Sequence, residues 1–216
     1  VAAARGPAGT RTVLRVRYPA TDGGMALRGS VVPLNWERGV SFAQTSNNTW
    51  EWSTDALTQA LEWKPLLDDR TWSRGPNYRA ATGTTVEVFP HFRTQIGTVS
   101  RRYPSFMSAV LNNRRGVWVY LPPSYEENPL ARFPVVYMHD GQNVFDPMTA
   151  FGGVAWEADD AMNAGAENGQ IREAIIVGVE NTAARIDEYT ATRDADIGAG
   201  GRGSLYVRML ADEVKP

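Results

Sequence analysis

The chain has 216 residues, of which 43% are hydrophobic and 21% are charged, and its formal net charge is −2. These values are ordinary for soluble globular domains, and the even mixture of charges excludes the basic surface that nucleic acids require. No apolar run approaches the roughly 20 residues of a membrane span. Cysteine is absent, which excludes disulfides, thiolate metal sites and a cysteine nucleophile. We therefore expect a soluble protein that binds neither nucleic acid nor membranes.

The first nine residues are rich in Ala, Gly and Pro, do not begin with Met and contain no apolar core of a signal peptide. Such a segment is typical of a mature N-terminus after signal removal. The absence of cysteine leaves the redox compartment undecided. We expect a secreted or periplasmic protein.

Residues 12–92 show short stretches in which apolar and polar side chains alternate. Leu14, Val16 and Tyr18 alternate with arginines, and Leu61 and Trp63 alternate with Glu and Lys. Period-two patterns between Gly, Pro and Asn turns indicate antiparallel strands with one exposed face. About eighty such residues predict a compact β-sandwich over residues 10–95.

Residues 93–115 are polar and weakly periodic, and we interpret them as a linker followed by the first edge strand of a second domain. Beyond Gly116, apolar runs at 117–121, 133–138 and 174–179 predict strands, the last two being central parallel strands. Helical spacing at 156–164 and 204–214 completes an alternating α/β layer. The alternation stops at Pro216, where another parallel strand should follow. We therefore expect a domain, residues 96–216, that is incomplete at its C-terminal side.

Two loops follow the central strands and are candidates for chemistry. His139-Asp-Gly-Gln-Asn143 follows the first strand, and Glu180-Asn-Thr182 follows the second. In open α/β sheets, binding sites form at the carboxyl ends of strands. We expect the functional site at these two loops.

Three motifs in this region carry a family resemblance: Tyr137-Met-His-Asp-Gly-Gln-Asn143, Ile175-Ile-Val-Gly-Val-Glu-Asn181 and Arg185-Ile-Asp-Glu-Tyr-Thr190. They resemble the esterase family of α/β-hydrolases that includes enterochelin esterases, feruloyl and acetylxylan esterases and S-formylglutathione hydrolase. The resemblance spans about residues 114–216. It implies that residues 96–216 are the N-terminal half of an α/β-hydrolase domain.

The resemblance also implies roles for the residues of the two loops. The backbone N–H of Gln142 would contribute to an oxyanion hole, Gly141 would let the backbone approach the substrate, and His139 would orient the loop. The substrate-binding residues would be Asp140, Asn143, Asn181 and Arg185. The alternative is a tight turn in which Asp140 and Asn143 only satisfy backbone donors.

The family's nucleophile is a serine in a G-x-S-x-G elbow, followed by an acid and a histidine. No G-x-S-x-G occurs here, and Ser204 stands at a predicted helix start, where we interpret it as an N-cap. The two histidines are His91, in the predicted sandwich, and His139. We therefore expect the nucleophile, acid and base to lie outside this sequence or on another chain, and these 216 residues alone to be inactive.

The N-terminal region has its own resemblance, to starch-binding modules of amylolytic enzymes. Its motifs are Leu27-Arg-Gly-Ser30, Leu34-Asn-Trp-Glu37, Leu61-Glu-Trp-Lys64 and Trp72-Ser-Arg-Gly-Pro-Asn77. By this resemblance Trp36 and Trp72 stack on sugar rings, while Lys64 and Asn77 donate or accept hydrogen bonds. The alternative is that both tryptophans serve packing, as we expect for Trp50, Trp52 and Trp63.

Two weaker motifs predict no cofactor. Residues 198–203 match G-x-G-x-x-G, but a polar segment precedes them where a dinucleotide-binding fold needs a strand. Asp194 and Asp196 resemble a calcium loop, yet Leu205 occupies the position of its closing glutamate. We expect neither a cofactor nor a metal.

The combined interpretation is a serine ester hydrolase that acts through an acyl-enzyme. Its substrate would be a small-molecule or carbohydrate-linked ester, and its partners a polysaccharide and the missing C-terminal half of the hydrolase domain. The alternative is a non-catalytic carbohydrate-binding protein that carries a truncated or degenerate hydrolase domain, which the absent G-x-S-x-G favours.

Overall fold

A computed structural model describes residues 10–19 and 23–216, which form two compact units. The first unit contains the described residues up to Gly97 together with segments 122–133 and 163–173. The second unit contains 98–121, 134–162 and 174–216. In the described part of the chain, the helices are too short or too polar to cross a bilayer.

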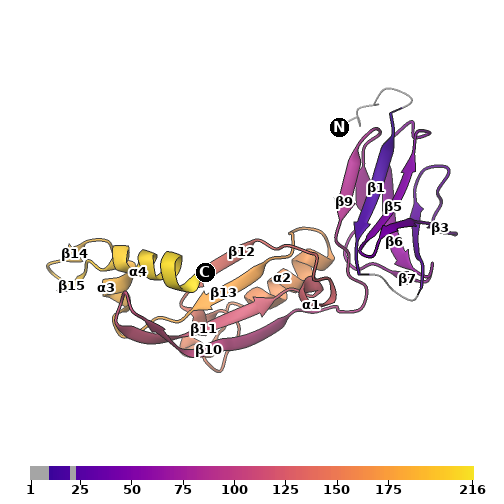
Figure 1. Ribbon diagram of the computed structural model, residues 1–216. Coiled ribbons are helices and arrows are strands. Elements are labelled where there is room, and N and C mark those ends of the chain that lie inside the picture. The colour runs from indigo at the N-terminus through magenta and orange to yellow at the C-terminus, as the bar shows by residue number, and fades with distance from the viewer. Residues whose placement is uncertain (1–9, 20–22) are drawn as a thin grey trace. The chain divides into compact units, whose positions relative to one another are not determined.

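The first unit is built from two sheets (Figure 1). One has the strand order β4-β5-β1-β9, and the other has the order β3-β2-β6-β7 with β8 also paired to β6. All pairs are antiparallel except β1 with β9. The strands are β1 (Thr12–Arg17), β2 (Met25–Gly29), β3 (Val40–Ser41), β4 (Ala43–Ser46), β5 (Thr49–Thr54), β6 (Leu61–Leu67), β7 (Thr71–Trp72), β8 (Tyr78–Ala80) and β9 (Thr85–Val88).

Both sheets contribute side chains to one hydrophobic core. Leu14 and Val16 of β1 and Trp63 of β6 are fully buried in it. On the other face of the first sheet, Arg15 of β1 bonds to Glu51, its register partner on β5. The alternation predicted from the sequence is therefore confirmed at these strands. Trp50 is also buried in this core, and Trp52 packs against it.

The short helix α1 (Ser124–Glu127) is bound to the end of the first unit's strands. The carboxylate of Glu127 accepts hydrogen bonds from three successive backbone N–H groups and one hydroxyl: Phe92, Arg93, Thr94 and Tyr18, at 2.6, 3.0, 3.0 and 3.1 Å. The amide of Asn128 donates to the carbonyls of Arg17 and Pro90, both at 2.9 Å. Segment 122–133 is thus part of the first unit's hydrogen-bond system.

The second unit contains a four-stranded sheet of order β10-β11-β13-β12 (Figure 1). Strands β12 and β13 are parallel, and the other two pairs are antiparallel. The strands are β10 (Thr98–Ser108), β11 (Asn113–Leu121), β12 (Val135–His139) and β13 (Ile175–Val179), with the hairpin β14 (Arg193–Asp194) and β15 (Ala199–Gly200). The helical segments of this unit are η1 (Gly141–Asn143), η2 (Phe151–Gly153), α3 (Arg185–Tyr189), α4 (Gly203–Met209) and η3 (Leu210–Val214). Helix α2 (Ala158–Glu167) begins in the second unit, and its residues from Asn163 onward belong to the first.

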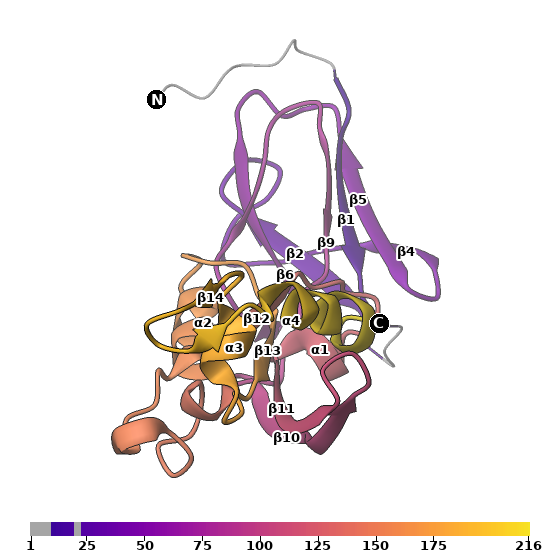
Figure 2. The same cartoon turned by 90° about the vertical axis from the view of Figure 1, so that its left-hand side faces the viewer.

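The two faces of this sheet carry separate hydrophobic clusters. Val177 and Val179 of β13 pack with Tyr206 and Met209 of α4. Ile176, which points to the opposite face, packs with side chains of the η1 region and the start of α2. In Figure 2, β12 and β13 accordingly lie between α2 and α4. The carboxyl ends of β12 and β13 lie side by side because the strands are parallel and His139 pairs with Val179.

The structure corrects four details of the sequence interpretation. Most of the predicted linker is strand, because β10 runs for eleven residues along β11. Strand β12 is an edge strand of the described sheet, and Val135 and Val136 are 42% and 44% exposed, where we expected a central strand buried on both faces. Ser204 lies within the first turn of α4, whose N-cap is Arg202, and is therefore not an N-cap. The predicted helix at 156–164 begins two residues later.

Candidate functional site

The predicted oxyanion loop, residues 139–143, leaves β12 through a left-handed residue. Asp140 has φ 53° and ψ 47°, and the N–H of Asn143 donates to its carbonyl at 2.8 Å to close a 3₁₀ turn. A Cβ on Gly141 would lie 2.4 Å from the carbonyl carbon and 2.5 Å from the oxygen of Gly178 on β13. Only glycine fits here because the contacting atoms belong to a strand backbone. The loop is therefore pressed directly against β13.

Asp140 fixes the oxyanion loop to the residues that follow β13. Its carboxylate accepts bonds from Nε and Nη2 of Arg185, both at 2.8 Å, and from the amide of Asn181 at 2.7 Å. The hydrogen bonds from Arg185, with those from Asn181, outweigh the effect of burial and lower the pKa of Asp140 to about 2. Asp140 is therefore ionised at neutral pH and has protein partners on both oxygens.

Asn143 and Gln142 of the loop are held by hydrogen bonds to residues outside it. The side-chain oxygen of Asn143 accepts the N–H of Phe151 at 2.7 Å, and its carbonyl accepts the N–H of Trp156 at 2.8 Å. Gln142 accepts the N–H of Asn181 with its side chain at 3.2 Å. The backbone N–H groups of Gly141 and Gln142 have no hydrogen-bond acceptor among residues 10–19 and 23–216. The loop thus combines engaged side chains with two unengaged backbone donors.

The structure therefore brings together the seven residues that we predicted for the esterase site. They lie at the carboxyl ends of β12 and β13 and at the start of α3: His139, Asp140, Gly141, Gln142, Asn143, Asn181 and Arg185. The polar side chains of Asp140, Asn181 and Arg185 bond to one another. Their substrate-binding role remains a prediction.

His139 contacts two tyrosines that the sequence interpretation did not include in the site. Its Nδ1 lies 3.0 Å from the hydroxyl of Tyr206 on α4, and the backbone N–H of Asp140 donates to the hydroxyl of Tyr189 on α3 at 3.2 Å. The rings of Tyr189 and Tyr206 are 4.9 Å apart. Burial raises the pKa of both hydroxyls, so both stay protonated at neutral pH.

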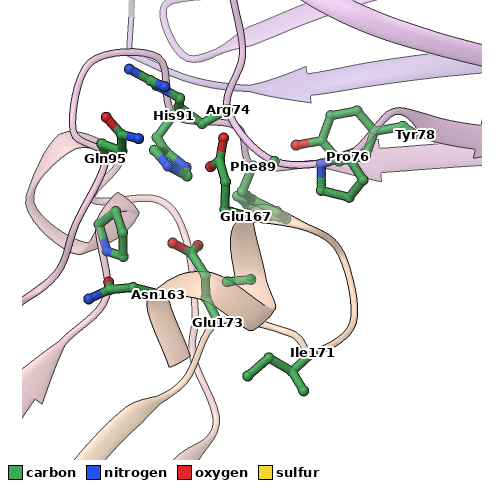
Figure 3. A pocket seen from close by; sticks show the side chains of 13 residues that line it. Arg74, Pro76, Tyr78, Phe89, His91, Gln95, Asn163, Glu167, Ile171 and Glu173 are labelled. Atoms are coloured by element: carbon green, nitrogen blue, oxygen red, sulfur yellow. The ribbon is translucent and has the colours of Figure 1, made fainter. Parts of the chain in front are cut away.

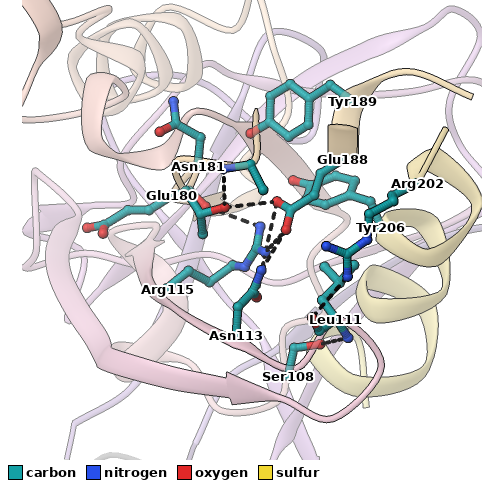
Figure 4. A network of polar contacts seen from close by, with 12 residues as sticks. Ser108, Leu111, Asn113, Arg115, Glu180, Asn181, Glu188, Tyr189, Arg202 and Tyr206 are labelled. Carbon is teal, nitrogen blue, oxygen red and sulfur yellow. Dashed lines mark hydrogen bonds and ion pairs between the residues drawn. The ribbon is translucent and has the colours of Figure 1, made fainter. Parts of the chain in front are cut away.

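A fully buried ion pair lies beneath these tyrosines (Figure 4). Nη2 of Arg115 on β11 lies 3.0 Å from both carboxylate oxygens of Glu188 on α3, and neither side chain is exposed. The amide of Asn113 donates to the same carboxylate at 2.6 Å, and the guanidinium of Arg115 lies 5.5 Å from the ring centroid of Tyr206. The ion pair therefore connects β11 to the two helices that carry the tyrosines.

The residues predicted to bind carbohydrate lie in the first unit. Trp36 and Trp72 are 36% and 39% exposed, their ring centroids are 6.1 Å apart and their planes are inclined by 40°. Arg28 lies over the Trp72 ring at 5.2 Å. Lys64 donates to the carbonyl of Gly75 at 2.5 Å, and Asn77 is exposed. Two exposed tryptophans therefore form a pair, while the ammonium of Lys64 already has a backbone partner.

A small pocket of about 140 Å³ lies elsewhere in the first unit (Figure 3). Figure 3 shows the His91 ring and the carboxylates of Glu167 and Glu173 directed into the same space. Glu173 is already bound to the hydroxyl and N–H of Ser124. No residue of the oxyanion loop lines this pocket. Among the described residues, no group of three or more His, Asp or Glu side chains is arranged to hold a metal.

Residues 108–216, half of the chain, match the protein family described as "Putative esterase". The chain belongs to this family. The matched segment includes the oxyanion loop, Asn181, Arg185 and both tyrosines of the site. No curated protein matches the chain.

Several solved structures resemble the chain. An IroE-like serine hydrolase from Shewanella oneidensis is 23% identical over 56% of this chain and 37% of its own, with a TM-score of 0.43. A ferulic acid esterase is 25% identical over 57% and 42% of the two chains, with a TM-score of 0.40. A carbohydrate-binding module of a β/α-amylase from Paenibacillus polymyxa is 22% identical over 37% and 83%, with a TM-score of 0.27. The chain thus spans about two fifths of the length of the serine hydrolase and of the ferulic acid esterase.

Proposed function

We propose that this chain supplies the oxyanion-stabilising loop of a serine ester hydrolase that acts on carboxylic esters through an acyl-enzyme. The nucleophile, the acid and the base would come from outside the 216 residues. Membership of the esterase family supports the reaction class. The observation that carries the proposal is the unengaged backbone N–H of Gln142 on a loop in which the carboxylate of Asp140 and the side-chain oxygens of Gln142 and Asn143 are bound.

The physical argument rests on preorganisation. An oxyanion is stabilised most by donors that are already oriented, because nothing must then reorganise as charge develops. The left-handed Asp140 directs the chain back across β13, and Arg185 holds its carboxylate with two bonds. Gly141 brings the backbone against Gly178 without an intervening side chain. These contacts favour a rigid loop with the Gln142 N–H free to donate.

Hydrolysis of a p-nitrophenyl ester, measured alongside intact mass and fluorophosphonate labelling, tests the esterase. Protein with additional mass should hydrolyse the ester and take up the label. The 216 residues alone, at 23.8 kDa, should do neither. Labelling of that bare chain would contradict the placement of the nucleophile outside it, and labelled-site mapping would identify the serine.

Two substitutions at one position test the backbone donor in the active protein. Gln142→Ala keeps the N–H and should retain most of the rate, whereas Gln142→Pro removes it and should lower kcat about 10²-fold or more. Both variants lose the side-chain contact with Asn181, so Gln142→Ala is the matched control. Equal losses in the two variants would argue against a backbone donor.

A second candidate function, carbohydrate binding by the first unit, is favoured by the exposed pair Trp36 and Trp72. Flat aromatic faces suit the C–H faces of sugars. Trp36→Ala with Trp72→Ala should abolish retention on starch while leaving hydrolysis of a small ester unchanged. Trp156→Ala, which removes an exposed tryptophan of the second unit, is the control.

Together, the two functions would describe an esterase acting on carbohydrate-linked esters. Retention on starch by a complete protein that neither hydrolyses esters nor takes up the label would favour a non-catalytic carbohydrate-binding protein instead. Unchanged retention in the double variant would exclude a sugar site at this pair.

A further inference from the structure

The exposed tryptophans of the first unit stand on two segments that are distant in the sequence. Trp72 belongs to the two-residue strand β7 and pairs with Leu66 of β6. Trp36 lies in a turn, where the side-chain oxygen of Asn35 accepts two backbone N–H groups at 2.9 and 2.8 Å. Because β7 is short and the turn belongs to no strand, strand pairing alone gives the two indole rings little support.

Arg28 of β2 contacts both of these segments with one side chain. Its Nη1 donates to the carbonyl of Trp36 at 3.0 Å, and its guanidinium carbon lies 5.2 Å from the ring centroid of Trp72. Its Nε and Nη2 donate to the carboxylate and the carbonyl of Asp69 at 2.8 and 3.1 Å. A guanidinium can make these contacts together, because its donors diverge in a flat fork while its face lies against an aromatic ring.

Asp69 joins the two turns to each other. It is a left-handed residue with φ 53°, three positions before Trp72. Its second carboxylate oxygen accepts the N–H of Gly39, three positions after Trp36, at 3.0 Å. A Cβ on Gly39 would collide with this carboxylate, so glycine permits the approach. Arg28 and Asp69 therefore clamp both tryptophan-bearing segments, and the Arg28 side chain is only 17% exposed.

We propose that Arg28 is a positioning residue that, together with Asp69, holds Trp36 and Trp72 as a preformed platform for sugar rings. This role rests on the second candidate function, carbohydrate binding by the first unit. Side chains that are ordered before a ligand arrives lose little freedom on binding, so a preformed platform binds more tightly than a mobile one. Arg28 thereby raises the affinity for sugar through the two indole rings.

Calorimetric titration of the full chain with maltoheptaose tests the effect on affinity. Arg28→Met keeps the length of the side chain but removes the donors, and it should weaken binding about tenfold, the effect of having to order two loosened side chains. Arg28→Lys keeps the charge without the flat fork and should give an intermediate affinity. Arg15→Met is the matched control, because it breaks an ion pair with Glu51 in the other sheet. It should bind like the native chain.

Circular dichroism tests the positioning itself without any sugar. Two indole rings whose centroids are 6.1 Å apart couple their electronic transitions, and the resulting couplet depends on their mutual orientation. The difference between the native chain and Trp72→Phe defines this couplet. Arg28→Met should lose most of it, whereas Arg15→Met should keep it. Thermal unfolding of the same variants separates a displaced pair from a general loss of stability.

The outcomes distinguish the clamp from the carbohydrate function on which it rests. Native affinity in a folded Arg28→Met chain would overturn the proposal. Weaker binding with an unchanged couplet would also overturn it, because Arg28 would then act by contacting the sugar. If Arg28→Met does not fold, Arg28→Lys and Asp69→Asn should each weaken binding and reduce the couplet, and native behaviour of both would overturn the proposal. Absence of binding by the native chain would instead refute the carbohydrate function, and the platform role with it.

Discussion

Arg185 and Asp140 form a bidentate ion pair in which Nε and Nη2 each lie 2.8 Å from a different carboxylate oxygen. The fork of the guanidinium matches the carboxylate, which fixes orientation as well as distance. Because Asp140 is a left-handed residue, this pair holds a backbone conformation that a non-glycine residue rarely adopts. The path of the oxyanion loop therefore depends on a residue 45 positions further along the chain.

This pair predicts a specific loss of stability in acid. The pKa of Asp140 is lowered from 3.8 to about 2, chiefly by the hydrogen bonds from Arg185. The ionised carboxylate therefore stabilises the fold above the ordinary value, and this contribution should disappear as the pH falls from about 4 through 2. Urea unfolding between pH 7 and 2 should show a smaller loss in Asp140→Asn than in the native chain.

Asp196→Asn, at an exposed position of the β14–β15 hairpin, is the control for that experiment. It should follow the native pH dependence. An equal acid sensitivity of Asp140→Asn and the native chain would contradict the assignment.

Gly141 should not tolerate even a methyl group. The added Cβ would lie 2.4 to 2.7 Å from backbone atoms of Gly178 and Val179, which cannot turn away as a flexible side chain would. Gly141→Ala should cost about 1–3 kcal/mol of unfolding free energy. Gly24→Ala, where nothing lies within 4 Å, should cost less than about 0.5 kcal/mol. Similar midpoints of thermal unfolding in the two variants would contradict the close approach.

Removing one partner of the buried Arg115–Glu188 ion pair should lower the free energy of unfolding more than replacing both partners by apolar residues. Glu188→Leu or Arg115→Met alone leaves one uncompensated group in a fully buried site and should cost about 3–5 kcal/mol. The double variant Arg115→Met with Glu188→Leu should recover most of that loss. A double-mutant cycle from urea unfolding measures the coupling, and additive effects of the two changes would show that the pair is not coupled.

Glu127 should stabilise the first unit through its charge. Burial alone would raise the pKa of this carboxyl. Hydrogen bonds from three backbone N–H groups and from Tyr18 outweigh burial, so the pKa of Glu127 lies below its ordinary value. Glu127→Gln should therefore cost about 1.5–3 kcal/mol near neutral pH, the range for hydrogen bonds to a charged group. The difference from the native chain should shrink as the pH falls below the ordinary value of 4.5, as the native carboxyl becomes protonated. Glu126→Gln, at the exposed neighbouring position, should change neither quantity.

The strands that carry the site could be predicted because their signal is local. The apolar runs before His139 and Glu180 end where the strands end, so the two loops were correctly placed at one edge of the sheet. Strand β10 was missed for a physical reason. Its pairing with β11 is interrupted by register shifts on both sides of Tyr103, and these irregularities destroy the period-two pattern.

The support of the site could not be predicted, because its contacts are long-range. Arg115 belongs to a sequence segment that looks solvated, yet it is buried against Glu188, 73 positions away. Tyr206 shows only as an apolar position on a helix, since nothing local indicates that its hydroxyl meets His139. Glu188 and Tyr189 lie inside the motif at residues 185–190. The motif does not indicate where their side chains point, because these directions follow from tertiary packing.

The chain passes between the two units five times, after Gly97, Leu121, Phe133, Met162 and Glu173. A cut near Gly97 would therefore not separate two modules. The carboxylate of Glu127 would lose its hydrogen bonds from Tyr18 and from the backbone N–H groups of Phe92 to Thr94. The amide of Asn128 would lose the two carbonyls that accept its hydrogen bonds. The segment that connects β11 to β12 thus makes its hydrogen bonds within the first unit. Replacing the N-terminal region by another domain would therefore also require redesign of this segment, which leads into the oxyanion loop.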